Sequence, residues 1–212
     1  MQMIRIDNVE VMGWEPAIRG MRNPMNSWDK SDSGYEQLMT YPTRYKVGPN
    51  DLNLMMRLAK GGSTHAKYRR MIIVYMDITA PLYWWKEYDT YKVGTVANSC
   101  STMHKIHAKE FTVDDFSNDH LDDMYSLPEL ETIVYKLNRC RHLFLQTHHK
   151  KYWWQMIQLL PSSYNQKRTV MLNYEVLSHM YHDRKDHKLD EWREFCEMIK
   201  SLPYAQIITL ED

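Results

Sequence analysis

The sequence predicts a single α+β domain over residues 1–212, with strands in the first half of the chain and mostly helices in the second. Residues 3–12 (MIRIDNVEVM) alternate apolar and polar side chains, which is the period of a half-buried strand. Residues 71–79 (MIIVYMDIT) are rich in β-branched and aromatic side chains, as buried strands are. Amphipathic helical patterns dominate after residue 126. Hydrophobic residues make up 43% of the chain, which is enough to build a core.

The first half is expected to alternate these strands with helices. A short helix over residues 17–22 should follow the first strand and run into a loop rich in Pro, Ser and Asp. Residues 50–62 (NDLNLMMRLAKGG) predict a helix that Asn50 or Asp51 caps and that the two glycines end. Pro81 suits the first turn of an aromatic helix, PLYWWKEYDTY. A polar loop of small residues over 90–104 (TYKVGTVANSCSTMH) follows that helix.

The second half is expected to be largely helical. The acidic segment 112–126 predicts a loop with a short helix. Ser126 and Glu129 have the spacing of a capping box and should start a long helix that breaks near His148. Two further amphipathic helices are predicted over residues 168–182 and 189–202.

The cysteine content indicates a cytoplasmic protein, and the balanced charges give the chain no net electrostatic attraction for polyanions. Lys+Arg and Asp+Glu are both 27, and this zero net charge argues against nucleic acid or an anionic membrane as a partner. Three widely spaced cysteines fit a reducing compartment. No apolar run approaches the roughly 18 residues of a membrane helix, and the N-terminal residues do not resemble a signal peptide.

Three local patterns suggest chemistry, and each has a structural alternative. His179 and His182 lie one helical turn apart, but without a third ligand we expect a solvated helix end and no metal site. Residues 148–154 (HHKKYWW) mix cations and aromatics as single-strand nucleic-acid binders do, or form a helix with one wet and one buried face. Cys100 could be a nucleophile with His104 as base, although a partly buried thiol is the expectation.

A fourth pattern extends over much of the chain. STHAKYRR at residues 63–70 precedes the buried strand, Ala80-Pro81 opens the aromatic helix, and the polar stretch 90–104 follows it. This order and spacing resemble the flavin-dependent thymidylate synthases, the thymidylate synthase complementing proteins. Their R-H-R-x-x-S motif, then N-E-x-S-x-R, follows a histidine-bearing loop, a strand and a helix opened by Ala-Pro. Residues 9–23 and 159–187 resemble the family's opening and closing blocks.

The resemblance assigns roles residue by residue. Thr90, Tyr91 and Lys92 take the positions of R-H-R, and Arg184 takes that of the catalytic arginine that polarises the pyrimidine base. The implied cofactor-binding residues are His65, Arg70, Tyr91, Lys92, Thr95, Asn98 and Asn173. The implied substrate-binding residues are Glu87, Thr90, Ser99, Ser101 and Arg184.

The resemblance also implies a fold, ligands and an assembly. The fold would be that of the thymidylate synthase complementing proteins, with a central antiparallel sheet flanked by helices. The ligands would be FAD and a pyrimidine deoxynucleotide, dUMP or a relative of it. Methylenetetrahydrofolate would supply a one-carbon unit to C5 of the base, and NADPH would reduce the flavin. The assembly would be a homotetramer.

The sequence departs from the family at the motif itself. Thr90 and Tyr91 replace an arginine and a histidine, and Lys92 offers a point charge in place of a bidentate arginine fork. Ser99 stands where the family has an acidic residue. An alternative function is therefore a catalytically altered or inactive homologue that binds a nucleotide.

Overall fold

The computed structural model describes residues 3–36 and 44–210, and its internal contacts group into two units. Unit 1 comprises the described parts of Met1–Asp7, Asp77–Thr90 and Ala97–Thr169. Unit 2 comprises the described parts of Asn8–Met76, Tyr91–Val96 and Val170–Asp212.

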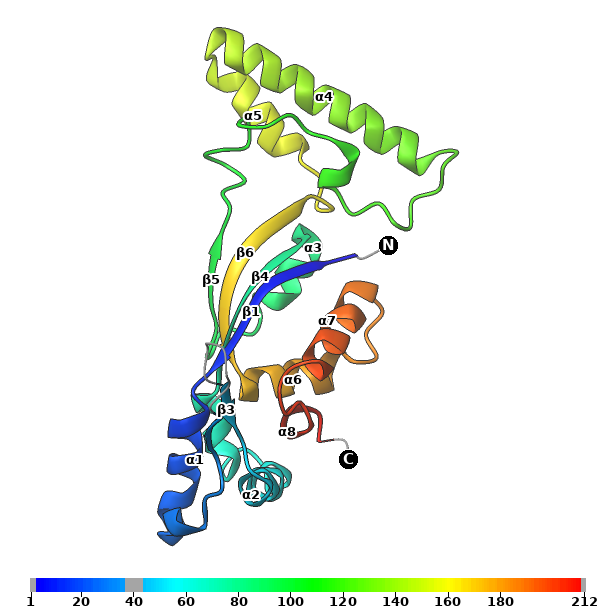
Figure 1. The fold of residues 1–212 in the computed structure, drawn as a ribbon. Coiled ribbons are helices and arrows are strands. Elements are labelled where there is room, and N and C mark those ends of the chain that lie inside the picture. Colours follow the sequence, from blue (N-terminus) through cyan, green and yellow to red (C-terminus); the bar gives the residue numbers. More distant parts are fainter. Residues whose placement is uncertain (1–2, 37–43, 211–212) are drawn as a thin grey trace. The chain divides into compact units, whose positions relative to one another are not determined.

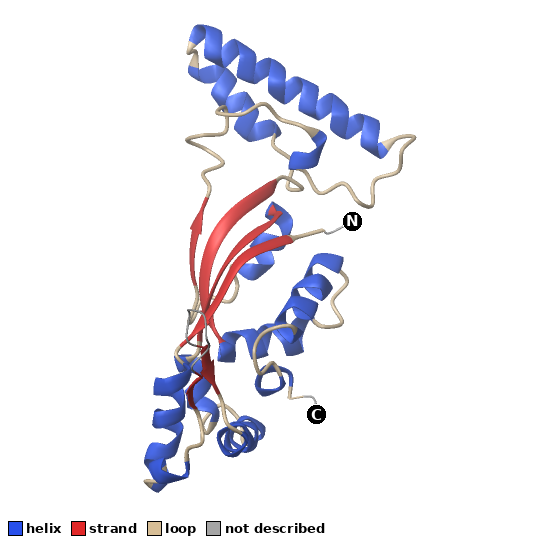
Figure 2. Cartoon of the chain, in the orientation of Figure 1, coloured by secondary structure: helices blue, strands red, loops and turns tan. Residues whose placement is uncertain are grey.

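The main sheet is antiparallel and has four strands in the order β1-β4-β6-β5 (Figure 2). Its strands are β1 (Arg5–Met12), β4 (Ile73–Pro81), β5 (Val96–Ser99) and β6 (Asn165–Asn173). The two strands predicted from residues 3–12 and 71–79 are therefore confirmed, as is the antiparallel sheet. A separate pair, β2 (Gly34–Glu36) and β3 (Arg44–Lys46), was not predicted and is antiparallel, with Tyr35 opposite Tyr45.

Two strands lie where the sequence predicted other structure. Residues 168–173 were predicted as the start of a helix, but they belong to β6, where Gln166, Val170 and Leu172 are buried at alternate positions. That is the period of a strand, so the helical prediction was correct only from Tyr174 onward. The predicted loop over 90–104 contains the short strand β5, whose four residues are all exposed.

Helices of unit 2 agree well with the predictions. The predicted helix over 17–22 is α1 (Trp14–Arg22), which starts one turn earlier, and the predicted helix over 189–202 is α7 (Asp190–Lys200). The other helices of this unit are α2 (Pro49–Lys60), α6 (Tyr174–Arg184), α8 (Gln206–Thr209) and the 3₁₀ segments η1 (Asn23–Met25), η2 (Trp28–Lys30) and η3 (Ala66–Met71).

The predicted cap of α2 is wrong. Gly48 is the N-cap residue, and the carboxylate of Asp32 accepts hydrogen bonds from the backbone N–H groups of Asn50 and Asp51. Asp51 does not cap the helix because its own carboxylate points inward, where it pairs with the buried guanidinium of Arg22 at 2.6 Å. The end of α2 at Gly61 agrees with the prediction.

Unit 1 contains α3 (Leu82–Tyr88), η4 (Val113–Asp115) and a helical hairpin of α4 (Ser126–Thr147) and α5 (Lys150–Leu159) (Figure 1). The predicted break near His148 is confirmed, because His148 has a left-handed backbone with φ 53°. The hairpin encloses a core of Phe111, Leu137, Met156 and neighbouring apolar residues.

The predicted capping box at the start of α4 is wrong. The carboxylate of Asp122 accepts hydrogen bonds from the backbone N–H groups of Met124, Tyr125 and Ser126. The hydroxyl of Ser126 donates to the same carboxylate at 2.6 Å, so it is not available to cap the helix. Asp122 therefore orders the turn that leads into α4, and of the helix's own N–H groups it accepts from that of Ser126.

Candidate functional site

The polar stretch 90–104 is ordered by its own small side chains. In unit 1, the hydroxyl of Thr90 donates to the carbonyl of Glu87 at 2.7 Å and closes the end of α3. The hydroxyl of Ser101 accepts from the backbone N–H groups of Met103 and His104 at 3.2 and 2.8 Å. Thr90 and Ser101 thus stabilise two turns that flank β5. The exposed strand β5 carries the predicted ligand residues Asn98 and Ser99.

Cys100 follows β5 directly. Its thiol was predicted to be partly buried, but the residue is exposed. The backbone N–H of Cys100 donates to the carbonyl of Lys167 at 2.9 Å, so this residue extends the pairing of β5 with β6. Cys100 is therefore held by its backbone at the edge of the sheet, where the residue is exposed.

In unit 2, the turn at residues 91–95 lies against helix α6. Within the turn, the hydroxyl of Thr95 donates to the carbonyl of Tyr91 at 2.5 Å. Gly94 has φ 78°, and a Cβ at this position would lie 2.9 Å from Nδ2 of Asn173 and 3.2 Å from a methyl of Val176. Only glycine combines this backbone conformation with so close an approach. The turn therefore packs against the start of the helix that Asn173 caps and that Arg184 ends.

Asn173 begins helix α6. Its side-chain oxygen accepts hydrogen bonds from the backbone N–H groups of Glu175 and Val176 at 3.1 and 3.0 Å. These bonds satisfy two of the N–H groups that a helix leaves unpaired at its start. The predicted flavin-side asparagine is thus a helix cap in this chain, and its amide nitrogen faces Gly94.

Arg184, the last residue of α6, is enclosed by two aromatic rings. Its Nε donates to the Tyr91 hydroxyl at 3.0 Å, and its guanidinium carbon lies 5.6 Å from the Tyr91 ring and 4.9 Å from the Trp192 ring. The Tyr91 hydroxyl in turn donates to the Asp183 carboxylate at 3.2 Å. Burial raises the pKa of Tyr91, so the phenol keeps its proton at neutral pH.

The cations upstream of β4 are already engaged within the chain. Arg70 forms a bidentate ion pair with Glu175 in the first turn of α6. Arg69 is buried and donates from Nη1 to the Ser178 hydroxyl and to the carbonyl of Ile207 at 3.0 and 3.2 Å. Arg70 was predicted to bind cofactor, and the structure shows it bound to a near-buried carboxylate. Lys92, by contrast, is an exposed cation next to Tyr91 in the turn.

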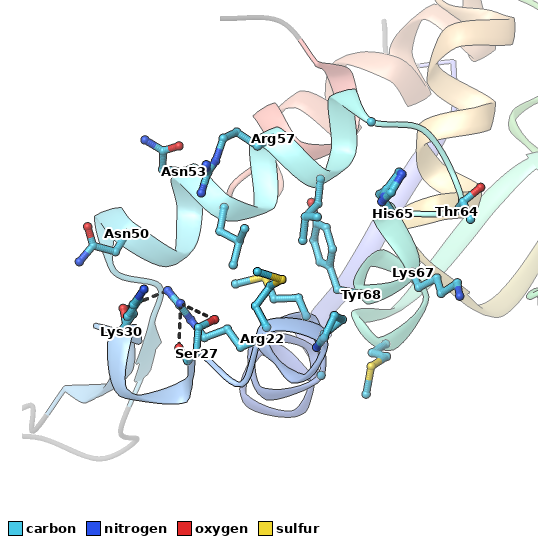
Figure 3. Close-up of a pocket in the computed structure, with 18 residues that line it drawn as sticks. Arg22, Ser27, Lys30, Asn50, Asn53, Arg57, Thr64, His65, Lys67 and Tyr68 are labelled. Carbon is cyan, nitrogen blue, oxygen red and sulfur yellow. Dashed lines mark hydrogen bonds between the residues drawn. The ribbon is translucent and has the colours of Figure 1, made fainter.

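His65 lines a pocket of about 1280 Å³ between α1, α2 and η3, all within unit 2 (Figure 3). The pocket has a basic lining, which includes Lys30, Arg57 and Lys67, and none of the described residues that line it is Asp or Glu. Figure 3 also shows that Arg22 is held inside this region by hydrogen bonds to the Ser27 and Lys30 carbonyls, both at 3.0 Å. The pocket is therefore suited to an anionic ligand.

Sequence reasoning identified His65 but missed its basic neighbours. Arg57 and Lys67 come from different elements, α2 and η3, and only the fold brings them to one pocket. A signal was present in the sequence, since the polar side of the predicted helix over 50–62 carries Arg57, but one isolated cation on a helix does not indicate a site.

The two histidines at 179 and 182 and the segment 148–154 lie at exposed or partly exposed positions on helices and at the end of one. Among residues 3–36 and 44–210, no group of three His, Cys, Asp or Glu side chains could hold a metal ion, and His179 and His182 are both exposed. In the segment 148–154, Lys150 stacks 6.0 and 5.9 Å from the Trp153 and Trp154 rings. No helix in the described part of the chain is long and apolar enough to span a membrane.

Two solved structures share this fold along nearly the whole chain. A crystal structure of thymidylate synthase X from Helicobacter pylori with FAD and dUMP matches with a TM-score of 0.70 at 15% identity, over 97% of each chain. A structure of flavin-dependent thymidylate synthase from Helicobacter pylori complexed with FAD and dUMP matches with a TM-score of 0.69 at 15% identity, over 96% of this chain and 98% of that one. No family model and no curated protein matches the sequence. The likeness confirms the predicted fold.

Proposed function

We propose that this chain is a divergent flavin-dependent thymidylate synthase-like enzyme that methylates C5 of a pyrimidine deoxynucleotide, dUMP or a relative of it. The observation that carries the proposal is the end-to-end match to a fold whose solved examples hold FAD and dUMP. The resemblance at His65, Asn173 and Arg184, which was visible before the fold, supports the same conclusion independently. We also propose that the protein is cytoplasmic and homotetrameric.

The basic pocket is the proposed site for FAD. Its donor set fits a dinucleotide, because Arg57, His65 and Lys67 line a volume large enough for such a ligand and no described lining residue is acidic. Arg57 and Lys67 would neutralise the diphosphate, and His65 would contact the ring system. FAD, when bound, supplies the hydride that reduces the one-carbon unit, with NADPH and methylenetetrahydrofolate as co-substrates.

Helix α6 and the turn before β5 form the proposed pyrimidine side. Arg184 would donate hydrogen bonds to the base, and Lys92 would provide a positive charge for the phosphate. Following the resemblance, we also propose substrate-binding roles for Glu87, Thr90, Ser99 and Ser101, and cofactor-binding roles for Arg70, Tyr91, Thr95, Asn98 and Asn173. The protein's task in this scheme is to position the reactants, since the cofactors carry the chemistry.

The second candidate function is nucleotide binding without catalysis, in a homologue that no longer methylates the base. The observation that favours it is the state of the motif residues in this chain. The Thr90 hydroxyl donates to the carbonyl of Glu87 in the last turn of α3. The Tyr91 hydroxyl is hydrogen-bonded to Asp183 and Arg184. Arg70 is paired with Glu175. These groups would have to exchange partners before they could bind a ligand.

Flavin binding tests the proposal. We would titrate the purified full-length protein with FAD, record its visible absorbance and repeat the titration with dUMP present. We expect a bound-flavin spectrum that shifts on addition of dUMP. In the double variant R57Q/K67Q, FAD affinity should fall by about tenfold or more, because two cations leave the pocket. The matched control, K136Q on the exposed face of α4, should bind FAD like the parent chain.

The outcomes separate the two functions. A flavin spectrum that responds to dUMP, followed by transfer of a labelled one-carbon unit to the base, supports the enzyme. Nucleotide binding without flavin retention favours the binding homologue. A protein that binds neither FAD nor dUMP at tens of micromolar would contradict both.

A further inference from the structure

Three elements of unit 2 converge on the guanidinium of Arg184. The residue ends helix α6, Tyr91 approaches from the turn before β5, and Trp192 approaches from α7. The Tyr91 and Trp192 rings have centroids 6.1 Å apart with planes at 62°. Trp192 is fully buried, so one wall of this arrangement is fixed by the core. The cation is therefore held by packing and by a hydrogen bond at the same time.

The Tyr91 hydroxyl is itself oriented. A phenol has one hydrogen to donate and lone pairs to accept with, and here it donates to Asp183 at 3.2 Å and accepts from Arg184 Nε at 3.0 Å. Asp183 therefore directs the phenol hydrogen away from Arg184 and leaves a lone pair facing the guanidinium. Asp183 and Arg184 are adjacent in the chain, so a single tyrosine fixes the end of α6 through both of them.

We infer that Tyr91 is a positioning residue that holds Arg184 for the pyrimidine base. The inference rests on the proposed function, because Arg184 is the residue proposed to contact the base. A free arginine at a helix end explores many rotamers, and the orientation of its N–H fork determines which carbonyl oxygen it meets. The hydrogen bond from the Nε–H of Arg184 to the Tyr91 hydroxyl favours one orientation of the guanidinium and so of its two terminal nitrogens. Tyr91 thus does its work through Arg184 and not by contact with the nucleotide.

The chain offers a matched pair of variants on one turn. Tyr91→Phe keeps the ring against Arg184 and removes only the hydroxyl, whereas Lys92→Gln removes the neighbouring exposed charge. We would measure the affinity of the FAD-loaded protein for dUMP and for 2′-deoxyuridine by calorimetry. If Tyr91 acts on the base through Arg184, Y91F weakens both ligands by the same factor, about tenfold, which is the lower range for a hydrogen bond to a charged group. K92Q weakens only dUMP.

A double-variant cycle separates positioning from a general structural role. Arg184→Lys removes the Nε–H donor, so Y91F should cause no further loss of dUMP affinity in the R184K background. If Y91F weakens binding equally in both backgrounds, or leaves binding unchanged in the parent chain, the inference is wrong. The readout is binding, so a chain that binds dUMP without turnover still tests it. A parent chain that binds neither ligand would instead contradict the proposed function, and the inference with it.

Discussion

Both polar atoms of the Asn173 side-chain amide lie against other parts of unit 2. Its side-chain oxygen caps α6, and its nitrogen faces Gly94. Replacing Asn173 with Ala should lower the free energy of unfolding by about 1 kcal/mol, because two backbone N–H groups lose their acceptor. Urea unfolding followed by far-UV circular dichroism measures this loss.

Asn173→Asp is the matched variant, because aspartate caps a helix as well as asparagine does and its charge suits the helix N-terminus. We expect N173D to keep the parent stability and to bind FAD more weakly, since a carboxylate replaces the amide of a residue proposed to bind this anionic cofactor. Equal FAD affinity in N173D and the parent chain would limit Asn173 to its capping role.

Asp51 is a buried carboxylate on α2, and its charge is compensated. Burial by itself would raise its pKa, but hydrogen bonds from Ser33, Ser31 and Arg22 outweigh burial and hold the pKa below 3.8. Asp51→Asn should cost about 3–5 kcal/mol at pH 7, because the buried guanidinium of Arg22 loses its partner. Asp29→Asn, an exposed change on η2, should leave stability unchanged.

The contribution of Asp51 has a defined pH dependence. Its folded-state pKa is depressed, so its stabilisation is complete above about pH 5 and is lost as the pH falls through the unfolded-state and then the folded-state pKa. The stability difference between the parent chain and D51N should therefore be constant from pH 7 to pH 5 and shrink in more acidic buffer. A difference that does not change down to pH 2 would argue against an ionised Asp51 in the folded protein.

At this scale the sequence identified residue types well and their partners poorly. His65 lines a pocket, Asn173 is the N-cap of α6 and Arg184 is the last residue of that helix, while the ligand roles of all three stay predictions. The pairing of Arg70 with Glu175 was not predictable, because 105 positions separate the two residues. Partners at such distances are set by the fold and leave no local pattern.

The turn at residues 91–95 is the element on which the candidate site depends, and Gly94 decides how closely it approaches α6. Gly94→Ala should destabilise the protein by about 1–2 kcal/mol from its left-handed backbone alone, and further from the contact with Asn173. Gly62→Ala is the matched control, because Gly62 has φ 86° but nothing within 4 Å of a new Cβ. We expect G94A to lose clearly more stability than G62A in urea unfolding. Equal losses of stability in G94A and G62A would mean that a Cβ at position 94 does not clash with Asn173 or Val176.

The elements that sequence reasoning missed share a physical cause. Residues 165–173 satisfy both a helical and an alternating pattern over short windows, and pairing with a neighbouring strand selected the strand. Strand β5 is short, polar and exposed, so nothing in its composition distinguishes it from a loop. The first N–H groups of α2 bond to Asp32, which lies 18 positions before Asn50, and the first N–H of α4 bonds to Asp122 in the preceding turn. Long helices were predicted reliably because their apolar stripe is repeated over several turns.

The whole molecule is proposed to act as a homotetramer, and its surface gives a reason to expect association. Met25 and Val93 in unit 2 and Met124, Tyr125 and Tyr135 in unit 1 are all more than 60% exposed. Burying such side chains against a second copy of the chain removes apolar surface from water and stabilises the assembly. Light scattering during gel filtration should give about four times the 25.6 kDa of one chain. Tyr135→Lys on α4 should shift the mass downward, whereas Glu131→Lys, a charge change at an exposed position one turn away, serves as control. A monomeric mass for the parent chain at high protein concentration would contradict the proposed assembly, because the exposed apolar side chains would then need a different partner.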